Sequence, residues 1–294
     1  MSIAVIINPI SGGARPETAG ARASLAAAVV ERHGEQADVF ITERAGHARE
    51  LARAAVGLGA RLVIAWGGDG TINEVMSALA FGDVPLGIVA AGSGNGLARE
   101  LGLDVRPEQA IANALAAPPR PMDLGELGGR LFANVAGIGI DAYVAAQFNE
   151  ARHAGRGFAG YLRIGAKALL SYEPVSYAIT VGETRRVVRA LVVVVANSAQ
   201  YGNGAKVAPG ARVDDGELDL VFVEERSRLA TICQVPRLFA GTIAKAPGYS
   251  RQSLREVTIE SPAPMTFHVD GESVQGSARL DGRVHPGALR ICTK

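Results

Sequence analysis

The chain has 294 residues, which exceeds the usual size of one domain, so we expect one large domain or two modest ones. Hydrophobic residues make up 48% of the sequence and charged residues 20%, a balance that is ordinary for a globular core. The formal net charge of +1 excludes a global field that would attract nucleic acid or an anionic membrane, so any membrane contact must be local.

The N-terminal part of the chain alternates between strand-like and helix-like patterns. This alternation predicts an α/β domain in which parallel strands are joined by crossover helices. The expected strands are residues 3–7, 37–41, 61–66 and 85–90, and the expected helices are residues 17–33 and 47–58. In sheets of this kind, ligands bind beyond the carboxyl ends of the strands. Because Asn8, Thr42, residues 67–73 and Ser93 all follow such ends, we expect them to lie close together.

A cluster of prolines at residues 118–121 predicts a domain boundary, because prolines end helices and stiffen linkers. Beyond it, short strand-like runs separated by turn residues suggest a mostly antiparallel β-sandwich interrupted by helices. The runs are 131–136, 175–181, 187–196, 217–223, 256–260, 265–269 and 288–291, and the helical segments lie near 142–152, 161–171 and 226–240. We therefore predict a domain over residues 1–121 and a second over residues 122–294, with a cleft between them. The last residues of the chain can pack back on the first domain.

No secretion signal or membrane-spanning segment is evident in the sequence. The apolar run at residues 3–7 has the length of a strand and no basic segment before it, unlike a signal peptide. The longest apolar stretch, around residues 191–196, is too short to cross a bilayer. Cys233 and Cys292 show no metal-ligand spacing and are interpreted as reduced structural thiols. We expect a cytoplasmic protein that binds no nucleic acid.

Two glycine-rich runs carry most of the functional information. They are Gly67-Gly68-Asp69-Gly70-Thr71-Ile72-Asn73-Glu74 and Gly92-Ser93-Gly94-Asn95-Gly96-Leu97-Ala98. Glycine lets a phosphate approach the backbone without meeting a Cβ atom, while the free N–H groups of the following helix point at the anion. Asp69, inside the first run, suits a magnesium ion that bridges phosphate oxygens. Two such turns in succession predict a phosphate site, and the G-x-G-x-G spacing from Gly92 does not match the dinucleotide fingerprint.

These runs are part of an ordered series of motifs that resembles the diacylglycerol kinase catalytic family. That family includes the soluble bacterial lipid kinases and the sphingosine and ceramide kinases. The series is Asn8-Pro9-Ile10-Ser11-Gly12-Gly13, then the two glycine-rich runs, then Asp123-Leu124-Gly125, then Val269-Asp270-Gly271-Glu272. The resemblance implies a nucleotide-binding first domain, a lipid-substrate second domain and an active site in the interdomain cleft.

The first domain supplies the predicted nucleotide contacts. The sequence contains neither a Walker motif nor the motifs of protein kinases, so the phosphate cradle must be a different one, with Asp69 on magnesium and Thr71 and Asn73 as polar contacts. The resemblance adds Asn8, Thr42 and Ser93, although the residues alone also suit a plain turn at Asn8 and a helix cap at Thr42. The nucleotide-binding set is Asn8, Thr42, Gly67, Gly68, Asp69, Gly70, Thr71, Ile72, Asn73 and Ser93.

Glu272 is the predicted general base. The residues around it suggest a strand that turns at Asp270-Gly271 and projects the Glu272 carboxylate, which could take the proton of a lipid hydroxyl. Spacing alone favours an ordinary hairpin with a solvated glutamate. The resemblance implies the catalytic role, since the matching glutamate of the family is its proposed base. It also implies that Asp123 assists the catalytic magnesium, which makes Glu272, Asp69 and Asp123 the predicted catalytic set.

A second metal site is implied near residues 212–218. By resemblance, Asp215 and the main-chain carbonyls of Arg212 and Glu217 would hold a structural magnesium, since a tight loop can present such oxygens to a hard cation. The residues alone favour a β-turn with an acidic surface.

Two further segments leave alternatives open. Residues 137–141, with the sequence GIGID, suit either close backbone packing or a wall of the lipid pocket. Residues 226–251 combine apolar and basic side chains, which suits docking at a membrane surface. Packing of a helix onto the sandwich explains the same pattern and is favoured. The five histidines show no ligand spacing and receive no role.

The leading functional prediction is an ATP-dependent, Mg²⁺-requiring lipid kinase, a phosphotransferase whose acceptor is an alcohol group on a diacylglycerol-like lipid at the membrane surface. The Gly-Ser-Gly-Asn form of the second run looks more like that of sphingosine kinases, so a sphingoid-base or ceramide acceptor stays open. The alternatives are a kinase of a soluble substrate, NAD kinase-like, and a non-catalytic nucleotide- or lipid-binding protein. A homodimer, and transient association of a cytoplasmic enzyme with the membrane surface, are both compatible with this prediction.

Overall fold

The computed structural model describes residues 2–13, 18–150 and 158–293. Contacts between residues divide the chain into two compact units. The first unit consists of Met1–Met122 together with Gly287–Lys294, and the second of Asp123–Pro286. The chain passes from the first unit to the second within strand β5 (Pro119–Leu127) and returns within strand β15 (Arg279–Cys292).

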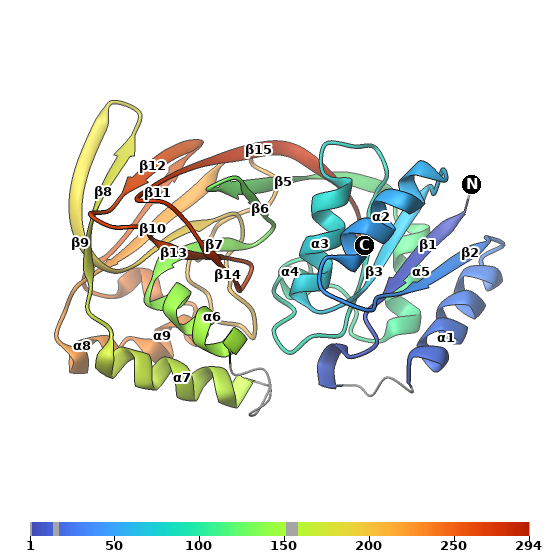
Figure 1. Ribbon diagram of the computed structural model, residues 1–294, viewed down its shortest axis with the longest axis horizontal. Helices are drawn as coiled ribbons and strands as arrows, with labels where there is room; N and C mark the ends of the chain where they lie inside the picture. Colours follow the sequence, from blue (N-terminus) through green and yellow to red (C-terminus); the bar gives the residue numbers. More distant parts are fainter. Residues whose placement is uncertain (1, 14–17, 151–157, 294) are drawn as a thin grey trace. The chain divides into compact units, whose positions relative to one another are not determined.

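The first unit contains a parallel sheet with the strand order β4-β3-β1-β2 (Figure 1). Its strands are β1 (Ile3–Ile7), β2 (Ala37–Ile41), β3 (Leu62–Gly67) and β4 (Leu86–Ala90). Ile291, near the end of β15, pairs in parallel with Leu86 and extends this sheet. Strands β1, β3 and β4 are almost wholly buried, which explains why they are near-continuous apolar runs.

Helices cover both faces of this sheet, with α1 and α5 on one face and α2 and α3 on the other (Figure 1). The helices are α1 (Ala19–Arg32), α2 (His47–Gly57), α3 (Asp69–Leu79), α4 (Gly96–Glu100) and α5 (Pro107–Ala116), with a 3₁₀ turn at Ser11–Gly13. Alternate residues of the strands, including Val5, Ile64 and Val89, pack against Val29 and Ile111 of α1 and α5. This packing fixes the carboxyl ends of β1, β3 and β4. The loop of Asn8 follows β1, and the two glycine-rich turns follow β3 and β4.

The second unit is mostly antiparallel. Strand β9 pairs with β7, β8 and β10, so one long strand holds several ladders together. Strand β15 pairs with β12, which also pairs with β8, and β13 pairs with both β7 and β14. The strands are β6 (Arg130–Phe132), β7 (Val135–Gly139), β8 (Val175–Val181), β9 (Thr184–Ala196), β10 (Leu218–Glu224), β11 (Tyr249–Leu254), β12 (Glu256–Glu260), β13 (Thr266–Val269) and β14 (Glu272–Gln275).

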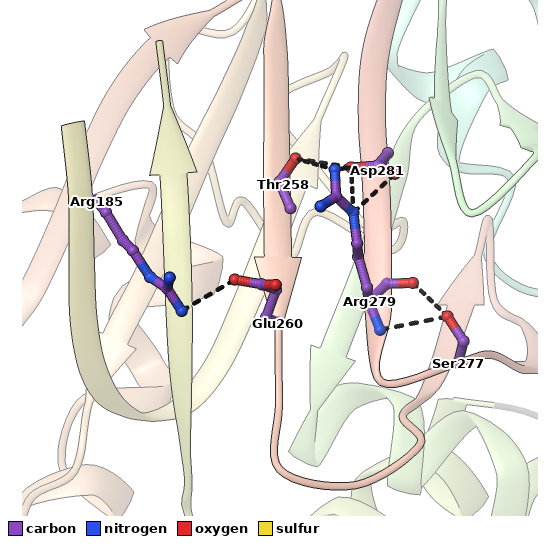
Figure 2. A network of polar contacts seen from close by, with 6 residues as sticks. All are labelled: Arg185, Thr258, Glu260, Ser277, Arg279 and Asp281. Atoms are coloured by element: carbon purple, nitrogen blue, oxygen red, sulfur yellow. Dashed lines mark hydrogen bonds and ion pairs between the residues drawn. The ribbon is translucent and has the colours of Figure 1, made fainter. Parts of the chain in front are cut away.

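The second unit also contains short helices and an apolar core. The helices are α6 (Ile140–Glu150), α7 (Phe158–Ser171), α8 (Arg228–Ile232) and α9 (Val235–Ala240), followed by a 3₁₀ turn at Ile243–Lys245. Phe132, Tyr177 and Phe267 are among the largest fully buried side chains of the core. Figure 2 shows polar contacts of β9, β12 and β15, where Arg279 pairs with Asp281 and Arg185 pairs with Glu260.

The elements of the second unit differ from the predicted ones at several points. The expected strand 131–136 is two strands, because the carboxylate of Asp270 accepts the N–H groups of Ala133, Asn134 and Val135 where the run breaks. The expected helix 226–240 is likewise two short helices, α8 and α9. Strands β5, β11 and β14 were not expected, since their sequences lack long apolar runs. No helix in the described part of the chain is both long and apolar enough to span a membrane.

Candidate functional site

The two glycine-rich turns of the first unit touch each other through their backbones. The turn after β3 and the turn after β4 approach so closely that a Cβ atom on Gly92 would lie 2.7 Å from the Cα atom of Gly68. The N–H of Ala91 donates to the carbonyl of Gly67 at 2.8 Å, which fixes the start of the second turn. Glycine is therefore required at position 92 by the space available, and a Cβ atom on Gly68 would lie a tight 3.2 Å from Gly92 Cα. The two turns form one continuous backbone surface.

Asp69 links the same two turns. It is the first residue of α3, and its Oδ1 atom accepts the N–H of Gly96 at 2.7 Å, at the start of α4. The Oδ2 atom of Asp69 lies close to Gly94, because a Cβ atom added to Gly94 would be 2.9 Å from it. Asn95 closes the second turn by accepting the N–H of Gly92 on its own Oδ1 at 2.7 Å. The Asp69 carboxylate thus connects the two turns at the predicted phosphate site by binding the backbone of Gly96.

Asn8 and Thr71 meet beyond the ends of β1 and β3. The Nδ2 atom of Asn8 donates to Thr71 Oγ1 at 2.9 Å, and a Cβ atom on Gly67 would collide with the Thr71 side chain at 2.5 Å. Arg22 of α1 holds the loop after Asn8, because its guanidinium donates to the carbonyls of Asn8 and Ser11 and to the Ser11 hydroxyl. Burial lowers the pKa of Arg22 from its ordinary value. The first-strand loop is thereby tied to the glycine-rich turns.

Thr42 lies at the end of β2, and its N–H donates to the carbonyl of Ile7 at 2.9 Å. The segment after it is anchored by Glu74 of α3, whose carboxylate accepts the N–H of Gly46 at 2.7 Å and of Ala48 at 3.0 Å. These bonds satisfy free N–H groups at the start of α2. Glu74, the last residue of the first glycine-rich run, therefore joins that run to the segment after Thr42.

The remaining predicted nucleotide contacts divide between the surface and the interior. Ser93 is exposed on the second turn, while Gly68, Asp69 and Gly70 are half-buried. Ile72 and Asn73 are buried in α3, and the Oδ1 atom of Asn73 accepts the hydroxyl of Ser77 at 3.4 Å. The geometry gathers Asn8, Thr71, Asp69 and both glycine turns.

This arrangement fits phosphate and a divalent cation. The start of α3 and the glycines of both turns bring backbone to this surface, where an anion can approach without meeting a Cβ atom at Gly68, Gly92 or Gly94. Mg²⁺ in nucleotide sites is commonly held by one or two protein carboxylates together with phosphate oxygens and water, so a single carboxylate such as Asp69 suffices. Among the residues that the structure describes, no group of three or more His, Cys, Asp or Glu side chains could hold a metal alone.

In the second unit, Asp123 is attached to the predicted metal loop. Its buried carboxylate accepts the N–H of Gly216 at 2.6 Å, and its own N–H donates to the carbonyl of Val213 at 2.7 Å. Asp215 is exposed and accepts the N–H of Glu217 at 3.1 Å. The structure thus brings Asp123 and residues 212–217 together. A cation at this loop would depend on main-chain carbonyls as well as on Asp215.

Glu272 follows a tight hairpin turn between β13 and β14. Val269 pairs with Glu272 in the ladder, and Asp270 and Gly271 between them have φ angles of 48° and 86°. Two positive φ angles are what a two-residue type I′ turn needs, and Asp-Gly suits it. The Asp270 carboxylate accepts three backbone N–H groups, and its own N–H donates to the carbonyl of Val135 at 2.9 Å. Glu272 itself is exposed at the end of this braced turn.

Residues 137–141 pack closely. A Cβ atom on Gly137 would lie 1.9 Å from Asp141 Oδ2 and 2.7 Å from His268 Nε2. Gly139 has a φ angle of 105°, and a Cβ atom there would lie 2.5 Å from the carbonyl oxygen of Leu191. The glycines are needed for backbone packing, which was one of the two open interpretations. The buried pair of Asp141 and His268 was not anticipated, because a histidine inside an apolar strand was its only signal.

A polar groove of about 890 Å³ opens elsewhere on the second unit. It contains ion-paired side chains such as Glu126, Arg279 and Arg283, and none of the predicted site residues lines it. Burial alone would raise the pKa of Glu126, but hydrogen bonds from His285 and Arg283 outweigh burial and hold that pKa below its ordinary value. Since Glu126 and Asp281 are neutralised by Arg283 and Arg279, we assign the groove no ligand.

Known proteins resemble both units. Residues 2–127 match the diacylglycerol kinase catalytic domain, and residues 134–293 match the YegS C-terminal NAD kinase beta sandwich-like domain. A probable lipid kinase YegS-like protein of Pseudomonas fluorescens is 32% identical over 260 residues, covering 88% of this chain and 86% of the relative. A diacylglycerol kinase of Mycobacterium tuberculosis is 29% identical over 279 residues, covering 92% of this chain and 88% of that protein.

The fold also has solved counterparts. The crystal structure of a putative diacylglycerol kinase from Bacillus anthracis str. Sterne matches with a TM-score of 0.80 at 20% sequence identity, covering 100% of this chain and 95% of that one. At this identity the likeness establishes the fold and no more.

Proposed function

Because the chain belongs to the diacylglycerol kinase catalytic family, we propose that it is an ATP-dependent lipid kinase that phosphorylates a hydroxyl of a diacylglycerol-like lipid. The observation that carries the proposal is the pair of contacting glycine-rich turns with Asp69 between them. Their N–H groups bind the phosphates of the nucleotide, and the glycines leave room for them. Bound Mg²⁺ would neutralise charge on the triphosphate, and Asp69 would hold it there, with Asp123 assisting.

Glu272 acts on the acceptor in this proposal. Its carboxylate takes the proton of the lipid hydroxyl while the lipid oxygen bonds to the γ-phosphorus and the bond from that phosphorus to the bridging oxygen breaks, releasing ADP. The support is the braced hairpin, which presents an exposed carboxylate. Asn8, Thr42, Thr71 and Ser93 contact the nucleotide. A structural Mg²⁺ at Asp215 and the carbonyls of Arg212 and Glu217 is a separate part of the proposal.

The decisive experiment offers γ-labelled ATP and Mg²⁺ to the full chain with a panel of acceptors: a diacylglycerol, a sphingoid base, a ceramide and NAD. Label in the organic phase with diacylglycerol supports the proposal. Label that appears only with the sphingoid base or ceramide would favour the alternative suggested by the Gly92-Ser93-Gly94-Asn95 run. Label that stays in water with NAD, or no transfer to any acceptor, would contradict lipid phosphorylation.

The Glu272→Gln variant tests the base. We expect turnover to fall by about 100-fold or more, since general base catalysis typically contributes that much, while the affinity for ATP stays unchanged. Glu256→Gln, at another exposed glutamate of the second unit, serves as a comparison for the effect of removing one carboxylate. Full turnover by Glu272→Gln would contradict the role of Glu272.

The surface of the second unit supports a lipid partner. Large apolar side chains are exposed on α7, α8 and α9, with Leu229 at 78% and Leu170 at 56%. No residue of α8 or α9 is buried. The prediction that the apolar side chains of residues 226–251 pack onto the sandwich therefore does not hold for Leu229. Residues 226–246 contain Arg226, Arg228, Arg237 and Lys245 and no acidic residue. Basic and apolar side chains on adjacent helices suit the surface of an anionic bilayer.

Vesicle sedimentation tests this contact. Vesicles of phosphatidylcholine with phosphatidylglycerol should bind the protein, and Leu229→Ser should weaken binding about fivefold or more, since burying a leucine contributes on the order of 1 kcal/mol or more. Leu58→Ser is the matched control, because Leu58 is 79% exposed on the first unit. Equal losses in the two variants would contradict docking through α8.

A further inference from the structure

His268 is a buried side chain that the proposed chemistry does not use. It lies in β13 with 2% of its surface exposed. Its Nε2 atom is 3.1 Å from Oδ2 of Asp141, at the start of α6, and the hydroxyl of Tyr201 donates to the same oxygen at 3.0 Å. A buried imidazole with two such neighbours has a fixed ring plane, because rotation would break its bond to Asp141.

The other ring nitrogen faces the hairpin turn. Nδ1 of His268 accepts the N–H of Gly271 at 3.3 Å. A nitrogen that accepts a hydrogen bond carries no proton, so the proton of the neutral ring lies on Nε2 and is donated to Asp141. The ring therefore connects a carboxylate of α6 to the backbone of the turn that precedes Glu272.

The surrounding backbone is arranged to allow this contact. Gly137 of β7 lies opposite His268 in the ladder, and a Cβ atom there would overlap both Asp141 Oδ2 and His268 Nε2. Helix α6 packs against β7, β13 and β14, so the position of Asp141 is set by the same elements that form the hairpin. The glycine makes room for the carboxylate to reach the imidazole.

The two residues of the turn are held separately. Asp270 is fixed by its bonds to Ala133, Asn134 and Val135, and Gly271 is fixed by His268. Glu272 is the next residue, so a rotation of the Gly271 peptide would change the direction of its Cα–Cβ bond. A displacement on the order of 1 Å at a reacting group can lower a rate by about 100-fold.

We propose that His268 is a positioning residue for Glu272: the imidazole, oriented by Asp141 and Tyr201, holds the Gly271 N–H and thereby sets the direction in which the hairpin presents the carboxylate. This inference rests on the proposed role of Glu272 as general base. His268 touches neither substrate nor nucleotide in this account, and it acts through the backbone.

Two substitutions separate the bonds of the imidazole. In His268→Asn the amide oxygen comes near the place of Nδ1 and can accept the Gly271 N–H, whereas in His268→Gln the amide comes near the place of Nε2 and keeps the contact with Asp141. We expect His268→Gln to lower kcat about 10-fold with the KM for ATP within about twofold of wild type, and His268→Asn to retain more of kcat. If both variants only lower the melting temperature, and the folded enzyme keeps its kcat, the inference is wrong.

A double-mutant cycle tests the route through Glu272. If His268 acts only by placing that carboxylate, His268→Gln should add no further loss to Glu272→Gln. Additive losses would overturn the inference. An inactive Glu272→Gln beside a fully active His268→Gln would overturn the inference and leave the proposed function standing. A fully active Glu272→Gln would overturn the role of Glu272, and this inference with it.

The tautomer gives a test that needs no activity. Nitrogen-15 spectra of the histidine side chains in the full chain, assigned with His268→Gln, should show the proton of His268 on Nε2. A proton on Nδ1 would exclude the bond from Gly271 and contradict the proposal.

Discussion

In the first unit, the acidic side chains around the glycine-rich turns accept backbone N–H groups: Asp69 from Gly96, and Glu74 from Gly46 and Ala48. In the second unit, the hairpin after β13 has two acidic residues with different surroundings. Asp270 accepts three backbone N–H groups, and Glu272 is exposed two residues later. An acidic residue beside a glycine can therefore brace the backbone, as Asp270 does, or lie exposed at the surface, as Glu272 does.

The two regions also differ in what they offer a substrate. The turns of the first unit present backbone, because Gly68 and Gly92 leave no space for a side chain between them. The hairpin of the second unit presents a side chain on a backbone that other residues hold still. The first arrangement suits an anion and the second suits proton transfer.

If the proposed function is right, Asp69 both braces the backbone through the Gly96 N–H and holds a cation. Two substitutions separate these two roles. Asp69→Asn can still accept the Gly96 N–H but has no charge for a cation, so we expect turnover to fall by about 100-fold or more with little loss of stability. Asp69→Ala also loses the bond at the start of α4 and should lower the free energy of unfolding by about 1 kcal/mol. The labelled-ATP assay and urea unfolding measure the two effects. Full turnover by Asp69→Asn would contradict cation binding by Asp69 and leave it only the bracing role that Asp270 has.

Asp270 should behave as a brace alone. Asp270→Asn leaves buried N–H groups of residues 133–135 with fewer acceptors, and we expect the free energy of unfolding to fall by about 2–3 kcal/mol. Asp281→Asn is the control, because Asp281 is paired with Arg279 and Thr258 on the surface (Figure 2) and its loss should cost less than about 1 kcal/mol. Urea unfolding of both variants decides the matter, and equal losses would contradict the bracing role.

The backbone surface of the first unit is tested by adding one methyl group. Gly92→Ala places a Cβ atom 2.7 Å from Gly68 and must move the two turns apart, so we expect the affinity for ATP to weaken about tenfold. Gly57→Ala is the control, since Gly57 lies in α2 with nothing within 4 Å of an added Cβ, and it should leave binding unchanged. Calorimetric titration with ATP measures both. An unchanged affinity for ATP in Gly92→Ala would contradict the role of the two turns in nucleotide binding.

Much of the fold was predictable from local patterns. The α/β first part with parallel strands, the mostly antiparallel second part, the family and the class of enzyme, a kinase, are confirmed. Strand β3 and the turn after it follow from an apolar run and three nearby glycines, which depend on neighbours along the chain. The division of residues 131–136 into two strands was not predictable, because its cause is a carboxylate from a distant hairpin. The roles of the predicted site residues stay predictions.

By itself, the sequence determined where the backbone turns and which runs are apolar, since φ preferences and hydrophobic periodicity are properties of neighbouring residues. Only the tertiary structure decided which polar groups meet. Asn134 and Asp270 are 136 positions apart, and Asp141 and His268 are 127 apart. In both pairs, the hydrophobic periodicity and turn residues of each segment give no sign of the distant partner. Such pairs form because a buried polar group needs a hydrogen bond, and the packing of strands from different parts of the chain selects which group supplies it.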